Sequence, residues 1–188
     1  AVTQPGWQRG EISFNDYPIT FDDKFYFAFN VDVSEKVLSI EDVETPNNIA
    51  AVFANDAHFA FDKTGKGQID YSAFKQYSLI ILNQLSDISS GLSASLKEYS
   101  GNGGNIYIIP AANADISSYN AFLSGSNAGT YGEVQSKQGE VTKINMNEEV
   151  FKGVFNQLPK NVETPKIKKY YPVLAASAAM EREILATN

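Results

Sequence analysis

The chain has 188 residues, 43% of them hydrophobic, which suits one domain with a substantial core and a small extension. Its formal net charge of -7 argues against nucleic acid and anionic membrane surfaces as partners, because phosphate binding needs clustered Lys and Arg. The absence of cysteine excludes disulfides, thiolate metal sites and cysteine nucleophiles. No apolar run in the sequence approaches the roughly 20 residues needed to span a bilayer.

The first predicted unit is a β-hairpin within Glu11 to Val33. Phe25, Phe27 and Phe29 alternate with other residues at the period of two that is typical of a strand. Two strands cannot bury such an aromatic face alone. We therefore expect the hairpin to pack on the following domain or on a sheet outside this sequence.

Strands and helices alternate after the hairpin. Strands are predicted at Lys36–Ile40, His58–Phe61, Ser78–Leu82, Ile106–Ile109 and Glu140–Ile144. Helical segments are predicted at Pro46–Ala54, Tyr71–Gln76, Ser89–Gly101, Ser117–Leu123 and Glu148–Gln157, while Tyr170–Ala179 is ambiguous. The order strand, helix, strand implies right-handed parallel crossovers, and several of them imply a doubly wound α/β sheet.

The segment from Asp62 to Asp70 resembles the calcium loop of an EF-hand, with an aspartate at loop positions 1 and 9. Lys66 at position 5 would bring a positive charge to the ion, and Ala73 at position 12 cannot supply the bidentate carboxylate. We therefore predict no metal here, and interpret the segment as a surface turn between a strand and a helix.

No motif supplies an obvious nucleophile or anion site. The G-x-S-x-G elbow of serine hydrolases is absent from the sequence. The stretch Gly101 to Gly104 follows a helix and precedes a strand, whereas anion-binding loops open helices, so it is interpreted as a helix C-cap. His58 is the sole histidine and is interpreted as a partly exposed structural residue.

The carboxyl ends of the predicted strands carry the best candidates for a binding site. In a doubly wound sheet, ligands bind beyond these ends, near the point where the strand order reverses. The rule selects polar residues after three strands, namely Glu41, Asp42, Asn83, Gln84 and, within the segment 110–113, Asn113. Carboxylates and amides there could bind a polar ligand, although the same residue types also serve as caps and turns. No cofactor is predicted.

Several stretches carry a family resemblance. LIILNQLSDISSGLSASLKEYSGNGGNIYIIP resembles the glutamine-amidotransferase-like branch of the flavodoxin-like folds. The whole chain, including ISFNDYPITFDDKFYFAFNV, IDYSAFKQYSLIILNQL and YNAFL, is similar to the C-terminal part of BatA-like aerotolerance membrane proteins. The motifs are structural, so they imply a fold more directly than an activity.

The amidotransferase resemblance implies the fold without the chemistry. In that family the nucleophilic cysteine follows the strand that corresponds to Ile106–Ile109, where this chain has Pro110, Ala111 and Ala112. The catalytic histidine and glutamate have no counterpart either, because His58 lies far upstream. No catalytic residue is therefore carried over.

The BatA-like resemblance implies a domain on the periplasmic side of the cytoplasmic membrane, held there by segments outside this chain. Residues 1-34 would be the β-hairpin remnant of a preceding β-sandwich, and 35-188 an amidotransferase-like α/β domain truncated at its C-terminus. The partners would be other domains of the same membrane protein or other envelope proteins. The exposed strands could instead pair between two copies and give a homodimer.

Together these features predict a flavodoxin-like, class I glutamine-amidotransferase-like sheet, doubly wound and mostly parallel, with an N-terminal hairpin. The leading functional hypothesis is a non-catalytic module for protein interaction or ligand sensing in a membrane-anchored cell-envelope protein. The alternative is a hydrolase-type enzyme that uses Asp42, Asn83 and Asn113 at the strand ends. A deep cleft around Asn83 and Pro110 would favour the enzyme, and a filled surface would favour the module.

Overall fold

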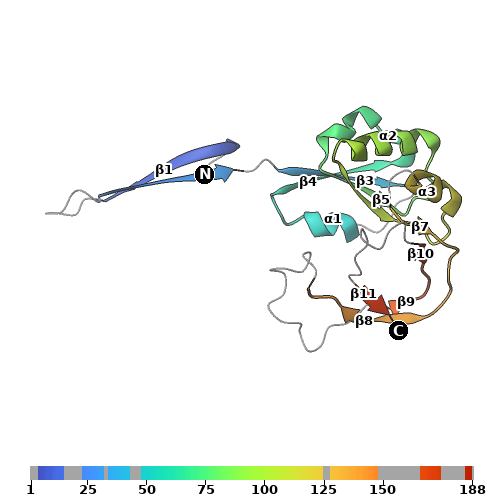
Figure 1. The fold of residues 1–188 in the computed structure, drawn as a ribbon. Coiled ribbons are helices and arrows are strands. Elements are labelled where there is room, and N and C mark those ends of the chain that lie inside the picture. Colours follow the sequence, from blue (N-terminus) through green and yellow to red (C-terminus); the bar gives the residue numbers. More distant parts are fainter. Residues whose placement is uncertain are drawn as a thin grey trace.

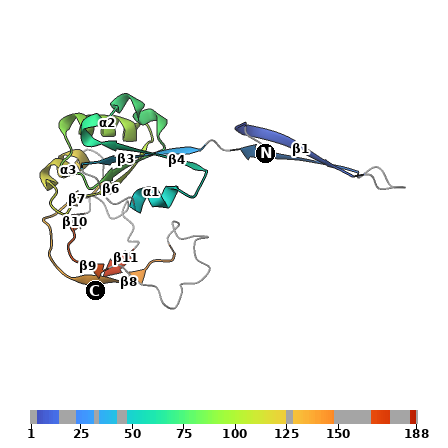
Figure 2. The same cartoon turned by 180° about the vertical axis from the view of Figure 1, so that it is seen from behind.

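The computed structural model describes residues 4–14, 23–31, 34–42, 48–124, 128–147, 166–174 and 185–187. At the N-terminal end, β1 (Gly6–Ser13) and β2 (Lys24–Val31) pair antiparallel along their whole length. This hairpin projects away from the α/β body of the chain (Figures 1 and 2). The first strand starts earlier than the sequence indicates, because β1 is polar and is held by its pairing with β2 rather than by its own propensity.

Within the described residues, the body contains a four-stranded parallel sheet in the order β4-β3-β5-β6. Its strands are β3 (Glu35–Glu41), β4 (Phe59–Gly65), β5 (Leu79–Asn83) and β6 (Asn105–Ile109). The chain runs from β3 outward to β4, returns past β3 to β5, and continues to β6. The order therefore reverses between β3 and β5, as in flavodoxin-like sheets, and the predicted parallel α/β fold is confirmed.

Helices cover both faces of this sheet (Figure 1). On one face lie the 3-10 helix η2 (Tyr71–Gln76), α2 (Ser90–Gly101) and α3 (Ile116–Leu123), and near β4 on the other face lies α1 (Asn48–Phe53). The main core joins Leu38, Ile40, Ile80 and Leu82 of the strands to Leu92, Leu96, Tyr119 and Phe122 of the helices. None of the described helices is both long enough and apolar enough to cross a bilayer.

The strand β4 is longer than the sequence indicates, and it corrects one prediction. Residues Asp62 to Gly65 belong to this strand and do not form the expected surface turn, while a short 3-10 helix, η1 (Lys66–Gln68), follows. The reason is tertiary, since β4 pairs with all of β3, from Glu35 opposite Phe59 to Glu41 opposite Gly65. His58 is exposed in the turn that precedes the strand.

The predicted fifth strand forms as β8 (Gly139–Ile144), but it does not join the parallel sheet. Among the described residues it pairs antiparallel with β9 (Lys166–Ile167) and β11 (Leu185–Thr187). Its mixture of polar residues with two apolar ones, Val141 and Ile144, suits an antiparallel strand outside the core sheet, whereas central parallel strands are apolar throughout. A further pair joins β7 (Thr130–Tyr131) to β10 (Val173–Leu174), and the predicted helix Glu148–Gln157 lies outside the described residues.

The glycine turn that ends α2 is structural, as its position after a helix predicts. Gly103 has a φ of 89°, in the left-handed region that glycine adopts without strain. At Gly104 a Cβ atom would lie 2.3 Å from the ring of Tyr99, so only glycine lets this strand start against the aromatic side chain. The two glycines thus have different tasks, one in backbone conformation and one in close packing.

Replacement of Gly104 by alanine is expected to lower the free energy of unfolding by about 2 kcal/mol, because the ring of Tyr99 must shift out of a packed position. Urea denaturation measures the change. Gly101→Ala is the matched control, since nothing lies within 4 Å of a Cβ atom at that position. Alanine there should keep or slightly raise the stability, and an equal loss for both variants would contradict the close-packing explanation.

Candidate functional site

The polar residues at the carboxyl edge of the sheet form the candidate site. Glu41 is the last residue of β3, and it stands opposite Asn83 of β5 and Gly65 of β4. The two strands that carry Glu41 and Asn83 are those between which the strand order reverses. The parallel register therefore brings these side chains together on one face of the sheet, the face opposite the main core.

The carboxylate of Glu41 is the centre of a buried polar network. Its Oε1 atom accepts hydrogen bonds from Ser39 Oγ and Asn83 Nδ2, both at 3.0 Å. Its Oε2 atom lies 2.6 Å from Lys63 Nζ. Glu41 is 4% exposed and Asn83 is 2% exposed. A carboxylate at such depth needs both charge compensation and hydrogen bonds, and this network supplies both.

The next residue, Asp42, belongs to a second, less buried network. Its Oδ2 atom accepts hydrogen bonds from the backbone N–H of Ser86, at 2.7 Å, and from the Ser86 hydroxyl. Its Oδ1 atom lies 3.7 Å from Lys66 Nζ, which also pairs with Asp87. The segment that follows β5 is thereby tied to the ends of β3 and β4.

The charges of this second network reinforce one another. Burial by itself would raise the pKa of Asp42, but the hydrogen bonds from Ser86 and the charge of Lys66 outweigh burial and hold that pKa below its ordinary value. Burial would likewise lower the pKa of Lys66, but Asp87 and Asp42 hold it above its ordinary value. Both groups are therefore charged at neutral pH.

The remaining predicted site residues lie apart from these networks. Gln84 has an exposed side chain and a φ of 56°, and its backbone N–H donates to the Ile109 carbonyl at 2.8 Å. Asn113 is exposed in the turn after β6. The structure thus brings Glu41, Asp42 and Asn83 to one edge of the sheet and leaves Gln84 and Asn113 at its periphery.

Sequence reasoning missed the basic partners of this edge. Lys63 and Lys66 compensate Glu41 and Asp42, and both come from the end of β4 and the residues directly after it. The rule that selects strand ends would have found them if β4 had been predicted to its full length. Ser86 and Asp87 lie two and three residues after Gln84, and their position shortly after a buried strand was the signal that could have selected them.

The position that holds the nucleophile in amidotransferases is a packed turn here. Ala111 is buried, and its carbonyl accepts a hydrogen bond from the Tyr171 hydroxyl at 2.9 Å. His58 precedes β4 and so lies at the opposite end of the strands from Glu41. In the part of the chain that the structure describes, no three acidic or histidine side chains form a group that could hold a metal ion.

These features define a flavodoxin-like α/β domain whose strand-end carboxylates are paired with lysine, hydroxyl and amide groups of the same chain. A solved structure from Bacteroides uniformis, described as a ThuA-like protein, is similar, with 18% sequence identity and a TM-score of 0.49. The match covers 84% of this chain and 65% of that one. No protein-family model and no curated protein matches the sequence.

Proposed function

We propose that this chain is a non-catalytic protein-interaction module of a membrane-anchored cell-envelope protein, and that the N-terminal hairpin is its contact surface. The observation that carries the proposal is the aromatic face of the hairpin, where Phe25 is 62% exposed. The polar groups at the carboxyl edge, by contrast, are bonded to one another. Exposed apolar surface of this kind marks contact sites in soluble domains.

The aromatic face is a continuous ridge. The rings of Phe25, Phe27 and Phe29 stack along β2, with centroids 6.4 Å and 5.9 Å apart. On β1, Gly10 stands opposite Phe27, and a Cβ atom there would lie 2.2 Å from the ring. The ring therefore lies across the backbone of β1, and the ridge covers the width of the hairpin.

The partner that fits this ridge is the apolar face of a second β-sheet, packed as in a β-sandwich. The opposite face of the hairpin is largely polar, and it includes an ion pair of 3.1 Å between Lys24 and Glu11. That face also carries Arg9, Trp7 and Tyr26. The face with the stacked phenylalanines has no charged side chain, whereas the opposite face has three, and an antiparallel sheet of this kind packs its uncharged face on a core.

The envelope assignment follows from the resemblance of the whole chain to BatA-like proteins. In this proposal the module lies on the periplasmic side of the cytoplasmic membrane, and membrane segments elsewhere in the protein anchor it. The second sheet then belongs to another domain of the same protein or to another envelope protein. The net charge of -7 fits a protein partner better than the phosphates of a membrane surface.

The hydrolase alternative needs Asp42, Asn83 and Asn113 to converge on a cleft. Asn83 is buried and donates to Glu41, while Asn113 lies in an exposed turn. Asp42 is bonded to Ser86 and Lys66. This arrangement favours the interaction module.

Site-specific photo-crosslinking in the native cell tests the proposal. A benzophenone amino acid replaces Phe25 in one variant and, as the control, Val52 in another, which is 72% exposed on α1. We expect crosslinks from position 25 alone, and mass spectrometry should map them to strands of another β-domain. Crosslinks only between two copies of this chain would assign the ridge to a homodimer and overturn the proposal, as would the absence of crosslinks from position 25.

A further inference from the structure

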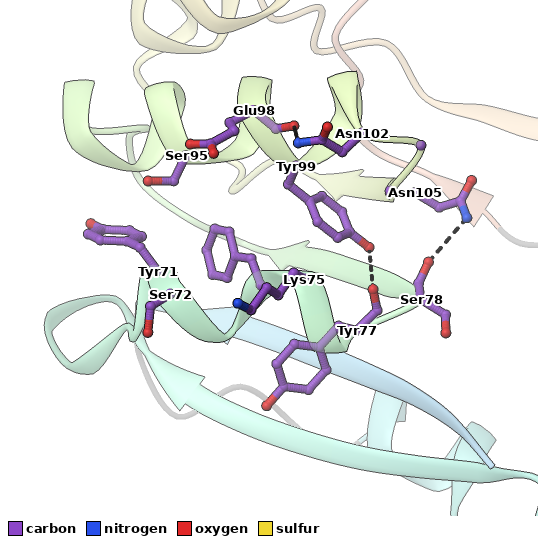
Figure 3. A pocket seen from close by; sticks show the side chains of 13 residues that line it. Tyr71, Ser72, Lys75, Tyr77, Ser78, Ser95, Glu98, Tyr99, Asn102 and Asn105 are labelled. Carbon is purple, nitrogen blue, oxygen red and sulfur yellow. Dashed lines mark hydrogen bonds between the residues drawn. The ribbon is translucent and has the colours of Figure 1, made fainter. Parts of the chain in front are cut away.

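A cavity of about 700 Å3 lies at the edge of the sheet opposite the polar networks. Its walls are η2 on one side and α2 on the other, and Ser78 and Asn105 line it where β5 and β6 begin (Figure 3). Its volume falls within the range of about 300 to 1,000 Å3 that small-molecule pockets occupy. The cavity is therefore large enough to hold a ligand of several dozen atoms.

The aromatic floor of the cavity is fixed before any ligand arrives. The hydroxyl of Tyr99 donates to the Tyr77 carbonyl at 3.0 Å (Figure 3), and Gly104 lies directly beneath the ring. Phe74 meets Tyr99 edge to face at 6.2 Å between centroids, and Tyr71 meets Phe74 in the same manner at 5.7 Å. A ligand would meet a rigid surface, so little ordering would oppose its binding.

The two walls present opposite charges. Lys75 comes from η2 and Glu98 from α2, and both line the cavity with exposed side chains (Figure 3). Within the described residues, neither side chain forms an ion pair with a protein group. The charges stand in contrast to Lys63, Lys66, Glu41 and Asp42, which compensate one another at the other edge.

We propose that this cavity binds a short zwitterionic peptide of two or three residues with free termini. The peptide carboxylate would pair with Lys75 and its ammonium group with Glu98, while an apolar side chain would contact the ring of Tyr71, which is 41% exposed. Charges on opposite walls of a cavity this size suit a ligand whose own charges are separated by several bonds. Binding of such a peptide does not depend on the role of the hairpin.

The same charges disfavour other ligand classes. A nucleotide or sugar phosphate would bring two or more negative charges next to Glu98, in a chain that already has a net charge of -7. A neutral sugar would offer neither group a counter-charge, and hydrogen bonds between charged groups are roughly twice as strong as neutral ones. A peptide with free termini satisfies both groups at once.

Isothermal titration calorimetry with the full chain tests the proposal, with Ala-Phe as the probe. We expect Ala-Phe to bind, and N-acetyl-Ala-Phe amide, which lacks both charges, to bind at least about tenfold more weakly. Because this comparison uses the unaltered protein, it does not depend on the folding of a variant. Absence of binding by Ala-Phe, or equal affinity for the capped peptide, would overturn the proposal.

Variants in which Lys75 or Glu98 is replaced test whether each charged side chain contributes to peptide binding. Lys75→Met and Glu98→Gln should each weaken the binding of Ala-Phe about tenfold. Lys97→Met is the matched control, because Lys97 lies on α2 but donates to the Ala121 carbonyl outside the cavity, and its loss should leave the affinity unchanged. Tight binding of maltose that Lys75→Met does not weaken would show that a neutral sugar is the preferred ligand, and the peptide assignment would be wrong.

Discussion

Replacing Glu41 with alanine is expected to lower the free energy of unfolding by about 3 kcal/mol. The variant leaves the amide of Asn83, which is 2% exposed, without the carboxylate to which it donates. The ammonium group of Lys63 loses its partner at 2.6 Å, but its side chain is 37% exposed and can turn to water. Because Lys63 is partly exposed, the expected loss of stability lies at the lower end of the range for a broken buried ion pair.

Guanidinium denaturation followed by far-ultraviolet circular dichroism measures this loss. Glu11→Ala is the matched control, because it also removes a glutamate that pairs with a lysine, here Lys24 at 3.1 Å, but both side chains are exposed. Surface pairs of this kind contribute at most about 1 kcal/mol. If the two variants lost the same stability, the carboxylate of Glu41 would not be a structural group, and the non-catalytic interpretation of this edge would be weakened.

Above pH 10 the chain is expected to lose stability steadily, with Tyr119 as a main cause. This side chain is fully buried, and its hydroxyl donates to the Leu85 carbonyl at 2.8 Å. Burial raises the pKa of Tyr119 well above its ordinary value of 10.0, and the neighbouring Tyr131 and Asp42 raise it further. Burial also raises the pKa of Tyr131.

The sign of the effect follows from proton linkage. The folded chain keeps the phenol of Tyr119 neutral, whereas the unfolded chain ionises near pH 10, so the unfolded state binds fewer protons above that pH. The stabilisation is complete below pH 10 and falls by about 1.4 kcal/mol for each pH unit above it, for each such tyrosine, until the pKa of the folded state is reached.

Tyr119→Phe isolates the contribution of this residue. At neutral pH the variant should lose about 1 kcal/mol, because the buried Leu85 carbonyl loses a hydrogen bond. Between pH 10 and 12 its free energy of unfolding should fall less steeply, by about 1.4 kcal/mol per pH unit. Tyr107→Phe, at an exposed position on β6, should keep the slope of the parent chain. Parallel slopes for the parent and Tyr119→Phe would contradict the prediction.

The central strands could be predicted because their apolar sequence reflects their burial in the sheet. Leu79 to Leu82 are apolar without alternation, as a strand covered on both faces must be. The edge strand β4 could not be predicted to its full length, because Asp62, Lys63 and Gly65 resemble turn residues in sequence. Their extended conformation is imposed by β3, and a pairing partner distant in sequence leaves no local signal.

The candidate site could likewise be predicted only where the sequence carries a local signal. Glu41, Asp42 and Asn83 could be selected from the sequence, because strand ends in a parallel sheet share one edge. Their lysine partners depend on where β4 ends, and the cavity between η2 and α2 depends on how two helices pack over the other edge. Gly103 and Gly104 line that cavity, but in the sequence they indicate only the end of a helix.

The strand order also bears on how the protein is made. β3 and β4 can pair as soon as both have left the ribosome, and β5 then adds beside β3, and β6 beside β5. Every strand of the parallel sheet after β3 thus finds a partner that was synthesised earlier, and all four strands come from residues 35–109. In a chain that is translated from its N-terminus, the pairing of these four strands therefore needs no contact from the residues that follow Ile109.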